Sequence, residues 1–264
     1  MKIDTCSRRP LLVPCKLKKP DYQIDPYIGC AHSCHYCYAL NQAETDWAKQ
    51  ILMFKDIRSQ LIEELENITP QNIYMGYYTD PYQPCEAEYL QTREVLEVLL
   101  EQGFTVSILT KSDLVLRDLD LFQGMKNASI SISVAFNDNR IRERFEANTK
   151  ETEVRIEALR KLREAGLKTS ALICPVMPYI TDVKPLIDRL EPLTDTIWIY
   201  GLSIEKCSDR NWRNLEIILK EYFPDLREPI EEIVSSKDHP FWAQLRQELE
   251  NIQKDRQLDL KIHV

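Results

Sequence analysis

Three cysteines are crowded into one short segment near the N-terminus. Residues 26–39 read PYIGCAHSCHYCYA, which places Cys30, Cys34 and Cys37 at the spacing C-x3-C-x2-C. Three neighbouring thiolates can ligate three irons of a [4Fe-4S] cluster, whereas ordinary electron-transfer clusters use four cysteines. The remaining iron is then open to a small chelating molecule, such as the methionine end of S-adenosylmethionine (SAM). An electron from the cluster can cleave the nearby sulfonium C–S bond and release a 5′-deoxyadenosyl radical.

A zinc site is the alternative for these thiols, with His32 or His35 as the fourth ligand. Zinc sites typically join two separated pairs of ligands, but here every candidate lies within one segment of eight residues. We therefore favour the cluster, and we expect both histidines to face solvent. A non-catalytic iron–sulfur or zinc-binding module is the second hypothesis.

The bulk composition limits the class of protein. The chain has 264 residues, 44% hydrophobic and 29% charged, which is an ordinary globular balance. No apolar run approaches the roughly 18 residues of a membrane span or the length of a secretory signal, so we expect a cytoplasmic protein with no membrane partner. The formal net charge of −8 argues against a surface coated for nucleic-acid binding. Eight cysteines are too few for a disulfide scaffold and indicate metal or redox chemistry.

The elements that must position the cysteine segment alternate between strand and helix. Repeated β–α units imply a parallel sheet with right-handed crossovers, and about six units fit an open barrel better than a closed barrel of eight. The predicted fold class is therefore α/β, a partial (β/α)6 TIM-like barrel with a small helical C-terminal extension. Strands are expected at 72–78, 105–110, 129–135, 168–174 and 196–201, and helices at 89–102, 114–122, 151–165 and 183–191.

Three parts follow from this pattern. Residues 1–22 form a basic N-terminal arm, which can contact phosphate or be a solvated terminal segment. Residues 23–202 form the core barrel. Residues 203–264 form a C-terminal helical extension that caps the barrel, with helices expected at 212–222 and 241–254 and a short strand at 258–264.

The strand expected at 129–135 alternates strictly between polar and apolar residues. Ser129, Ser131 and Ser133 share the face that would line the lumen, and the apolar residues between them would pack on the outer helices. A polar lumen suits a barrel that holds a ligand; a strand with a half-solvated face is the alternative.

The cysteine spacing, with an aromatic residue before the third cysteine, is similar to the signature of radical SAM enzymes. The resemblance extends over residues 20–182 and narrows to the branch containing spore photoproduct lyase and the smaller proteins labelled DNA repair photolyase. The matching blocks are DPYIGCAHSCHYCYA (25–39), YTDPYQPCEAEY (78–89), LTKSDLVLRDLDLF (109–122) and FEANTKETEVRIEALRKLREAG (145–166).

The resemblance implies SAM at the mouth of a partial barrel and a low-potential electron donor of the flavodoxin or ferredoxin type. Tyr36 is expected beside the adenine of SAM, and polar residues at the strand ends are expected to line the SAM or substrate cavity. Two of these, Asp80 and Ser112, are equally well placed to cap the helices that follow them. The cavity residues are Tyr78, Thr79 and Asp80 after the second strand, Thr110, Lys111 and Ser112 after the third, Ser133 on the fourth, and Glu146 in the FEANT block.

One departure from the lyase concerns the residue before Thr79. The lyase has a cysteine there that returns a hydrogen atom to the lesion radical, whereas this chain has Tyr78; Cys85 replaces it only if the following loop folds back. Tyr77 or Tyr78 can relay an electron or hydrogen atom, or simply pack. We therefore do not expect repair of spore photoproduct itself, and the substrate is a nucleic acid, a peptide or a metabolite. The remaining cysteines (Cys6, Cys15, Cys85, Cys174 and Cys207) are scattered, and we expect no auxiliary cluster.

Overall fold

A curved sheet of eight strands forms the centre of the molecule. The computed structural model describes residues 1–47, 49–236 and 238–264. Along the sheet the order is β11-β10-β9-β8-β7-β6-β3-β2, with every neighbouring pair parallel except β2 and β3. The strands are β2 (Leu12–Pro14), β3 (Tyr22–Ile24), β6 (Asn72–Met75), β7 (Thr105–Thr110), β8 (Ser129–Ser133), β9 (Lys168–Val176), β10 (Thr196–Gly201) and β11 (Leu260–His263).

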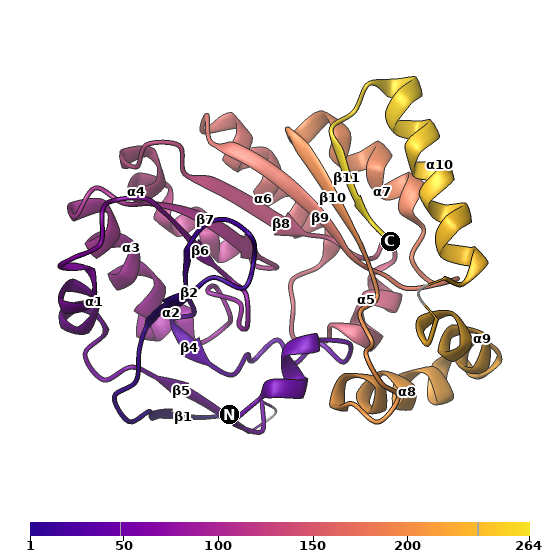
Figure 1. Cartoon of the computed structure of the whole chain (residues 1–264), viewed down its shortest axis with the longest axis horizontal. Helices are drawn as coiled ribbons and strands as arrows, with labels where there is room; N and C mark the ends of the chain where they lie inside the picture. Colours follow the sequence, from indigo (N-terminus) through magenta and orange to yellow (C-terminus); the bar gives the residue numbers. More distant parts are fainter. Residues whose placement is uncertain (48, 237) are drawn as a thin grey trace.

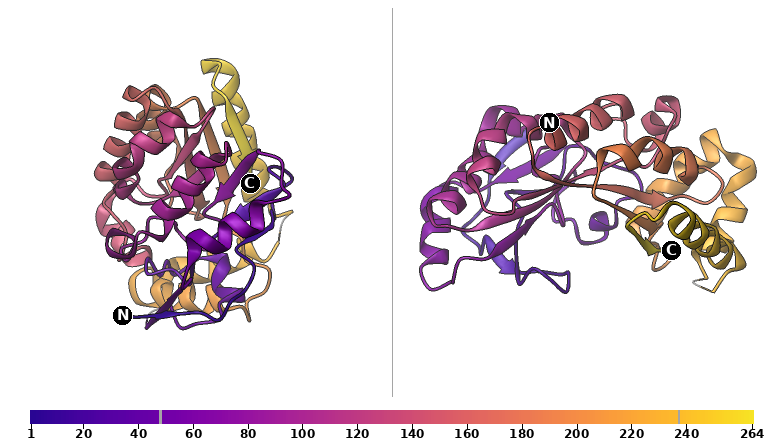
Figure 2. Two further views of the ribbon diagram at one scale, coloured as in Figure 1. Left: turned by 90° about the vertical axis from the view of Figure 1, so that its left-hand side faces the viewer. Right: turned by 90° about the horizontal axis from the view of Figure 1, so that it is seen from above.

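Helices cover one face of this sheet and leave the other face open. Figure 1 looks onto the open side, with α6 and α7 behind the sheet, and the left view of Figure 2 shows the helices gathered on one side. Of these, α6 packs on β8 and β9, α7 on β9, and α10 on β11. The helices along the barrel are α1 (Ile57–Leu65), α2 (Glu86–Tyr89), α3 (Gln91–Glu101), α4 (Leu119–Gly124), α5 (Asn139–Phe145), α6 (Thr152–Glu164), α7 (Val183–Leu190) and the short 3-10 helix η3 (Glu191–Leu193).

The predicted fold class is confirmed: the molecule is an α/β protein built as a partial barrel. Two edges of the sheet come from outside the predicted core. The strand expected at 258–264 forms β11, a seventh parallel strand beside β10, and β2 of the basic arm pairs with β3. Both terminal parts contribute strands to the central sheet. The division of the chain into parts at residues 22 and 202 stays a prediction.

Several predicted elements have different boundaries. The helix expected at 89–102 is divided into α2 and α3 at Leu90, whose φ is +56°. The segment 114–122 begins as the 3-10 helix η2 (Asp113–Asp118) before α4. The strand predicted at 72–78 ends at Met75 because Gly76, with φ +102°, turns the chain.

The C-terminal part contains α8 (Arg210–Tyr222), α9 (Pro224–Val234) and α10 (Pro240–Arg256). The sequence prediction missed α9, which begins at Pro224 and contains a second proline, Pro229. A separate sheet of β1 (Lys2–Thr5), β5 (Gln50–Met53) and β4 (Tyr27–Ile28), in the order β1-β5-β4, was also missed. None of the described helices has the length and apolarity to cross a bilayer.

The two faces of the sheet differ as the alternation along β8 predicts. Ile130 and Ile132 are fully buried against the outer helices, while Ser129 and Ser131 are partly exposed on the inner face. The inner serines pair across neighbouring strands, with Oγ–Oγ distances of 2.8 Å between Ser107 and Ser129 and 2.5 Å between Ser131 and Ser170. Around β8 the inner face is therefore polar and lined by small side chains.

Candidate active site at the barrel mouth

The cysteine segment follows β4 as a compact loop that leads into the 3-10 helix η1 (Tyr38–Gln42). Cys30 and Cys34 are buried and Cys37 is half-buried. Burial raises the pKa of all three thiols, and the charge of Lys111 opposes this rise at Cys34 and Cys37. A cation beside these sulfurs favours thiolates, the form that binds metal.

The loop is anchored on one side to the segment 78–89. The backbone N–H of Ala31 donates to Oε1 of Gln83 at 2.7 Å, and Nε2 of Gln83 donates to the carbonyl of Gly29 at 3.1 Å. Gly29 itself has φ +89°, and a Cβ there would lie 2.9 Å from Oγ1 of Thr45, so only glycine fits. The sequence prediction missed Gln83, although it lies within a matching block and is fully buried.

On its other side the loop is anchored to the FEANT segment. The backbone N–H of His35 donates to the carbonyl of Phe145 at 3.0 Å. Nδ1 of His32 lies 3.0 Å from the carbonyl of Asn148, and the hydroxyl of Tyr36 donates to Glu146. The loop that carries the three cysteines is thus held between two separate motif blocks.

The expectation that both histidines face solvent is wrong for His32. Its side chain is buried, with Nε2 only 3.2 Å from Oδ2 of Asp80. The contact with a carboxylate from the neighbouring strand end draws the ring inward. His35 is half-buried, and burial lowers the pKa of its imidazole.

Asp80 receives hydrogen bonds at both carboxylate oxygens. Oδ1 accepts from Oγ1 of Thr110 at 2.6 Å and from the N–H of Tyr82 at 2.8 Å, and Oδ2 accepts from the N–H of Lys111 at 2.7 Å. Burial acts to raise the pKa of Asp80, but His32 and these hydrogen bonds lower it to about 2. The carboxylate therefore ties the end of β6 to the end of β7.

Thr79 differs from Asp80 in that its side chain makes no hydrogen bond within the described part of the chain. The side chain is buried, and Oγ1 has no hydrogen-bond partner among the described residues. A buried polar atom without a partner is costly unless a ligand or water satisfies it. The N–H groups of Tyr78 and Thr79 both donate to Oδ1 of Asp25, at 3.0 and 3.1 Å, which fixes this turn.

Lys111 reaches into the mouth from the end of β7. Its Nζ donates to Oγ of Ser133 at 2.9 Å and lies 4.0 Å from Oε1 of Glu146. Burial acts to lower the pKa of Lys111, but the charges of Glu146 and Cys34 outweigh it and raise the pKa. One cationic side chain is thus held charged beside the cysteine loop.

Glu146 is fully buried and bonded to Arg155, which the sequence prediction missed. Nη2 of Arg155 lies 2.5 Å from Oε2 of Glu146, and Nη1 donates to the carbonyl of Ser133 at 3.0 Å. Burial acts to raise the pKa of Glu146, but the charges of Arg155 and Lys111 lower it below its ordinary value. The place of Arg155 in the sequence could have indicated its burial, because it lies next to Ile156 on the buried face of α6.

Three further predicted residues have other contacts. Ser112 caps η2, with its hydroxyl accepting from the N–H of Leu114 at 3.2 Å. Tyr78 packs against the apolar group of Cys30, Ala39 and Trp47, beside Cys37. Cys85 lies at the start of α2, and its apolar contacts are with Tyr27, Ala31 and Ile51.

Cys174, near the end of β9, lies close to the same site. Burial raises the pKa of its thiol to about 11, and the charges that act on it are those of Lys111, Cys37 and Glu146. All eight cysteines are free thiols. Among the described residues, no three His, Cys, Asp or Glu side chains are arranged to hold a single metal ion.

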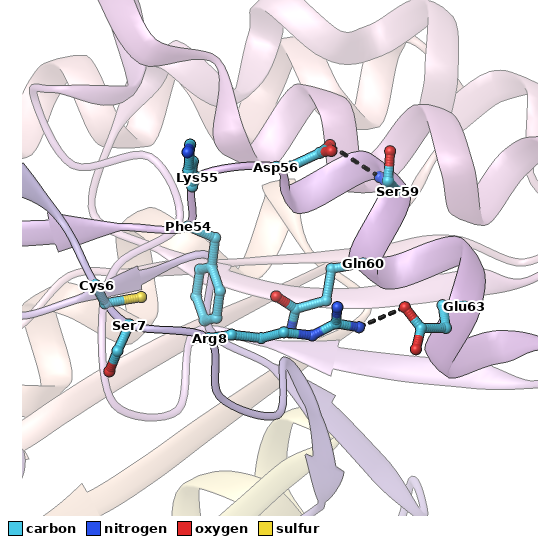
Figure 3. A pocket seen from close by; sticks show the side chains of 9 residues that line it. All are labelled: Cys6, Ser7, Arg8, Phe54, Lys55, Asp56, Ser59, Gln60 and Glu63. Atoms are coloured by element: carbon cyan, nitrogen blue, oxygen red, sulfur yellow. Dashed lines mark hydrogen bonds and ion pairs between the residues drawn. The ribbon is translucent and has the colours of Figure 1, made fainter.

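A pocket lies away from the barrel mouth, between the N-terminal arm and α1. Figure 3 shows Arg8 paired with Glu63 across this pocket. It also shows Asp56, which caps the start of α1 by accepting a hydrogen bond from the N–H of Ser59. Its volume is about 260 Å³, and none of the cysteines of the mouth lines it. The pocket therefore belongs to the outer surface and not to the barrel mouth.

Comparison with known proteins gives consistent results. A family model described as the Radical SAM superfamily matches residues 24–190. An uncharacterized protein of Methanocaldococcus jannaschii is 30% identical over 229 residues, which cover 85% of this chain and 83% of that protein.

Two solved structures share the fold at low identity. Spore photoproduct lyase complexed with dinucleoside spore photoproduct matches with a TM-score of 0.59 at 18% identity, covering 83% of this chain and 66% of the lyase. SuiB of Streptococcus suis bound to S-adenosylmethionine matches with a TM-score of 0.58 at 15% identity, covering 90% of this chain and 47–48% of SuiB. The chain thus spans slightly less than two thirds of the lyase and about half of SuiB.

Proposed function

Because the chain belongs to the radical SAM superfamily, we propose that it binds a [4Fe-4S] cluster through Cys30, Cys34 and Cys37 and cleaves SAM reductively. When bound, the cluster supplies the electron for this cleavage, which yields methionine and a 5′-deoxyadenosyl radical that abstracts hydrogen from a substrate. The observation that carries the proposal is the buried loop with three thiols, held at the barrel mouth beside one charged lysine.

The residues around the loop fit a cluster with one open iron. Three thiols come from a single loop, and a fourth thiol, Cys174, lies on the strand β9 and not in the loop. Lys111 offsets negative charge at the sulfurs. A non-catalytic iron–sulfur or zinc-binding module accounts for the thiols. It gives no role to the half-buried Lys111 or to the buried hydroxyl of Thr79, which has no partner in the described part of the chain.

We assign the SAM-facing roles to two groups at the mouth that have hydrogen-bonding capacity left: the hydroxyl of Thr79, and the ammonium of Lys111, which has three donors and gives one of them to Ser133. Thr79 offers a free buried hydroxyl, and Lys111 offers a cation suited to a carboxylate. Asp80, Ser112 and Glu146 act in this proposal by positioning Lys111 and the loop, since their polar atoms are already engaged. Tyr36 keeps its proposed place beside the adenine through its ring, with its hydroxyl held by Glu146.

The reaction we propose is not the repair of spore photoproduct itself. Tyr78 occupies the position of the lyase's hydrogen-donating cysteine, and Cys85 packs beside Tyr27 and Ile51. Tyr78 packs beside Cys30 and stands edge-on to Tyr77, with ring centroids 4.8 Å apart. We propose Tyr78 as the side chain at this position that meets the substrate radical, and Cys85 as a packing residue.

Reduction of the cluster requires an external electron donor. Superfamily members need a reductant, and we propose a flavodoxin or a ferredoxin for this chain. The eight free cysteines fit a reducing compartment, so we propose the cytoplasm as its location.

The proposal is tested by anaerobic reconstitution followed by reduction with dithionite in the presence of SAM. The expected product is 5′-deoxyadenosine, measured by chromatography. Cys34→Ala is expected to abolish both the visible absorbance of the cluster and the product. Cys207→Ala is the matched control, because this exposed thiol is remote from the loop in sequence and its hydrogen bond within the described residues is to Ser235.

Two results would refute the proposal. One is an intact cluster that yields no 5′-deoxyadenosine; the other is unchanged absorbance in Cys34→Ala. A single bound zinc ion in the oxygen-free protein would instead support the alternative.

A further inference from the structure

The indole ring of Trp47 is buried beside the cysteine loop. Trp47 lies in the segment between η1 and β5, and the residue is only 5% exposed. It belongs to the apolar group of Cys30, Ala39 and Trp47, and Cys37 packs against this group. Nε1 of Trp47 is buried and has no hydrogen-bond partner among the described residues. A hydrogen-bond donor without an acceptor therefore lies next to two of the three thiols.

The edge of the ring that carries the N–H faces the residue before Cys30. A Cβ on Gly29 would lie 3.2 Å from Cδ1 of Trp47, which is the carbon bonded to Nε1. The same Cβ would lie 2.9 Å from Oγ1 of Thr45. The pyrrole edge of the indole therefore packs on the backbone that leads into Cys30.

The segment that carries Trp47 and the cysteine loop are joined through one small sheet. The N–H groups of Lys49 and Gln50 both donate to the carbonyl of Asp46 at 2.8 Å, which closes a tight turn after Asp46. β5 begins at the end of this turn and pairs with β4, and β4 leads into the cysteine loop. The indole is thus fixed relative to the loop by backbone hydrogen bonds as well as by packing.

The neighbours of the indole limit which acceptor its N–H can find. The side chains of Ala39, Leu40 and Ala43 in the same group offer none. A protonated thiol is only a weak acceptor, whereas the sulfurs of an iron–sulfur cluster accept hydrogen bonds. A buried donor without a partner is costly unless a ligand or water satisfies it. The sulfurs of a cluster bound through Cys30 and Cys37 are acceptors on the side of the ring where the N–H lies.

Resting on the proposed function, we propose that the indole N–H of Trp47 donates a hydrogen bond to a sulfur of the bound cluster and raises the reduction potential of that cluster. Reduction adds one electron, and a hydrogen bond to a more negative acceptor is stronger. The N–H therefore stabilises the reduced form more than the oxidised form, and hydrogen bonds to sulfur are among the factors that set such potentials. A low-potential donor consequently reduces a larger fraction of the enzyme.

The test is a redox titration of the anaerobically reconstituted chain without SAM, followed by electron paramagnetic resonance (EPR) of the reduced cluster. Trp47→Phe keeps an aromatic ring in the apolar group and removes the N–H. The equilibrium constant for one-electron reduction is expected to fall about tenfold, which corresponds to a midpoint potential about 59 mV more negative. Trp242→Phe is the matched control, because this buried indole already donates to the carbonyl of Ile233, at 3.2 Å, and its loss is expected to leave the potential unchanged.

A second measurement decides the question if Trp47→Phe does not bind the cluster. Pulsed EPR of the reduced wild-type chain, labelled with ¹⁵N in the indoles of its tryptophans, is expected to show a coupling between ¹⁵N and the cluster. The label is expected to give the same coupling in Trp242→Phe. Oγ1 of Thr45 is also buried without a partner in the described part of the chain, so a water shared by Oγ1 and Nε1 is the competing arrangement. Such a water would leave the ¹⁵N coupling absent.

The proposal is overturned if Trp47→Phe titrates at the wild-type potential, if Trp242→Phe shifts the potential equally, or if the ¹⁵N coupling is absent. A loaded chain that cleaves SAM but gives one of these results refutes this inference alone. A loaded chain that shows the expected shift but forms no 5′-deoxyadenosine refutes SAM cleavage alone. A chain that binds no cluster refutes both.

Discussion

Replacing Arg155 with methionine is expected to destabilise the protein strongly, because it leaves the buried carboxylate of Glu146 without its nearest cation. Arg155 is 1% exposed and Glu146 is 0% exposed, and their closest charged atoms are 2.5 Å apart. After the substitution the carboxylate of Glu146 keeps the hydroxyl groups of Tyr36 and of Thr149, the latter at 3.4 Å, and its one remaining cationic neighbour among the described residues is Lys111, whose Nζ is 4.0 Å away. Breaking a buried pair by removing one partner typically costs about 3–5 kcal/mol.

This cost is large against the about 5–15 kcal/mol that separates folded from unfolded domains. Arg155 also donates to the carbonyls of Ser133, at 3.0 Å, and Lys150, at 2.8 Å, and both acceptors lose a donor. Changing Glu146 to glutamine in the Arg155→Met background removes the stranded charge. The double variant is therefore expected to be more stable than the sum of the two single losses predicts, by about 1–3 kcal/mol.

The assay is urea unfolding followed by circular dichroism under anaerobic conditions, with the wild type, both single variants and the double variant. Equal slopes of free energy against urea would validate the comparison. If the two single losses add within about 0.5 kcal/mol, the residues are energetically independent, and the reasoning from the buried pair is refuted. Arg163→Met serves as the control, because its pairing with Asp195 is exposed and exposed pairs contribute about 0–1 kcal/mol.

Three further predictions concern the turn after β6. Gly76→Ala is expected to destabilise the protein more than Gly103→Ala in thermal unfolding: both have positive φ, but only at Gly76 would a Cβ lie 2.4 Å from the carbonyl oxygen of Leu109. Thr79→Val is expected to leave the free energy of unfolding in urea within about 0.5 kcal/mol of wild type, since no described residue partners Oγ1, and to weaken SAM binding by about 2- to 12-fold in calorimetry. Burial raises the pKa of Asp25 to about 6, above the roughly 3.9 of the unfolded chain, so the folded state binds this proton more tightly. The free energy of unfolding is therefore expected to fall as pH rises from about 4 to about 6. Asp25→Asn is expected to remove that part of the pH dependence, and an unchanged stability profile between pH 4 and 6 would contradict the assignment.

The parallel strands were predictable where their own sequence decides their environment. β7 and β10 match the expected ranges 105–110 and 196–201, because short runs rich in β-branched and aromatic residues are typical of strands. By contrast, β1, β4 and β5 are short and pair over distances of up to about fifty residues, and no local period predicts such pairing. The missed helix α9 contains two prolines that mark a break on sequence grounds, although one of them occupies its first turn.

The cysteine loop was predictable from the sequence, and the residues that support it were less so. The spacing of the cysteines identified the loop directly, since the chemistry requires those residue types at that distance. His32 was misjudged because its burial depends on Asp80, 48 positions away in the chain, and Arg155 because a charged residue beside an apolar stripe normally reaches solvent. Both depend on tertiary contacts that only the fold reveals.

The motif blocks that resemble the family also supply the contacts that hold the loop of Cys30, Cys34 and Cys37. Gln83 of one block binds the backbone of Gly29 and Ala31, and Glu146 of another binds Tyr36. A loop that carries a cluster must keep its thiols in place without a fourth ligand, so it needs rigid partners on both sides. The blocks therefore act together, because each contacts one side of the same loop. Removing the contacts on either side is expected to make the positions of the three cysteines less fixed.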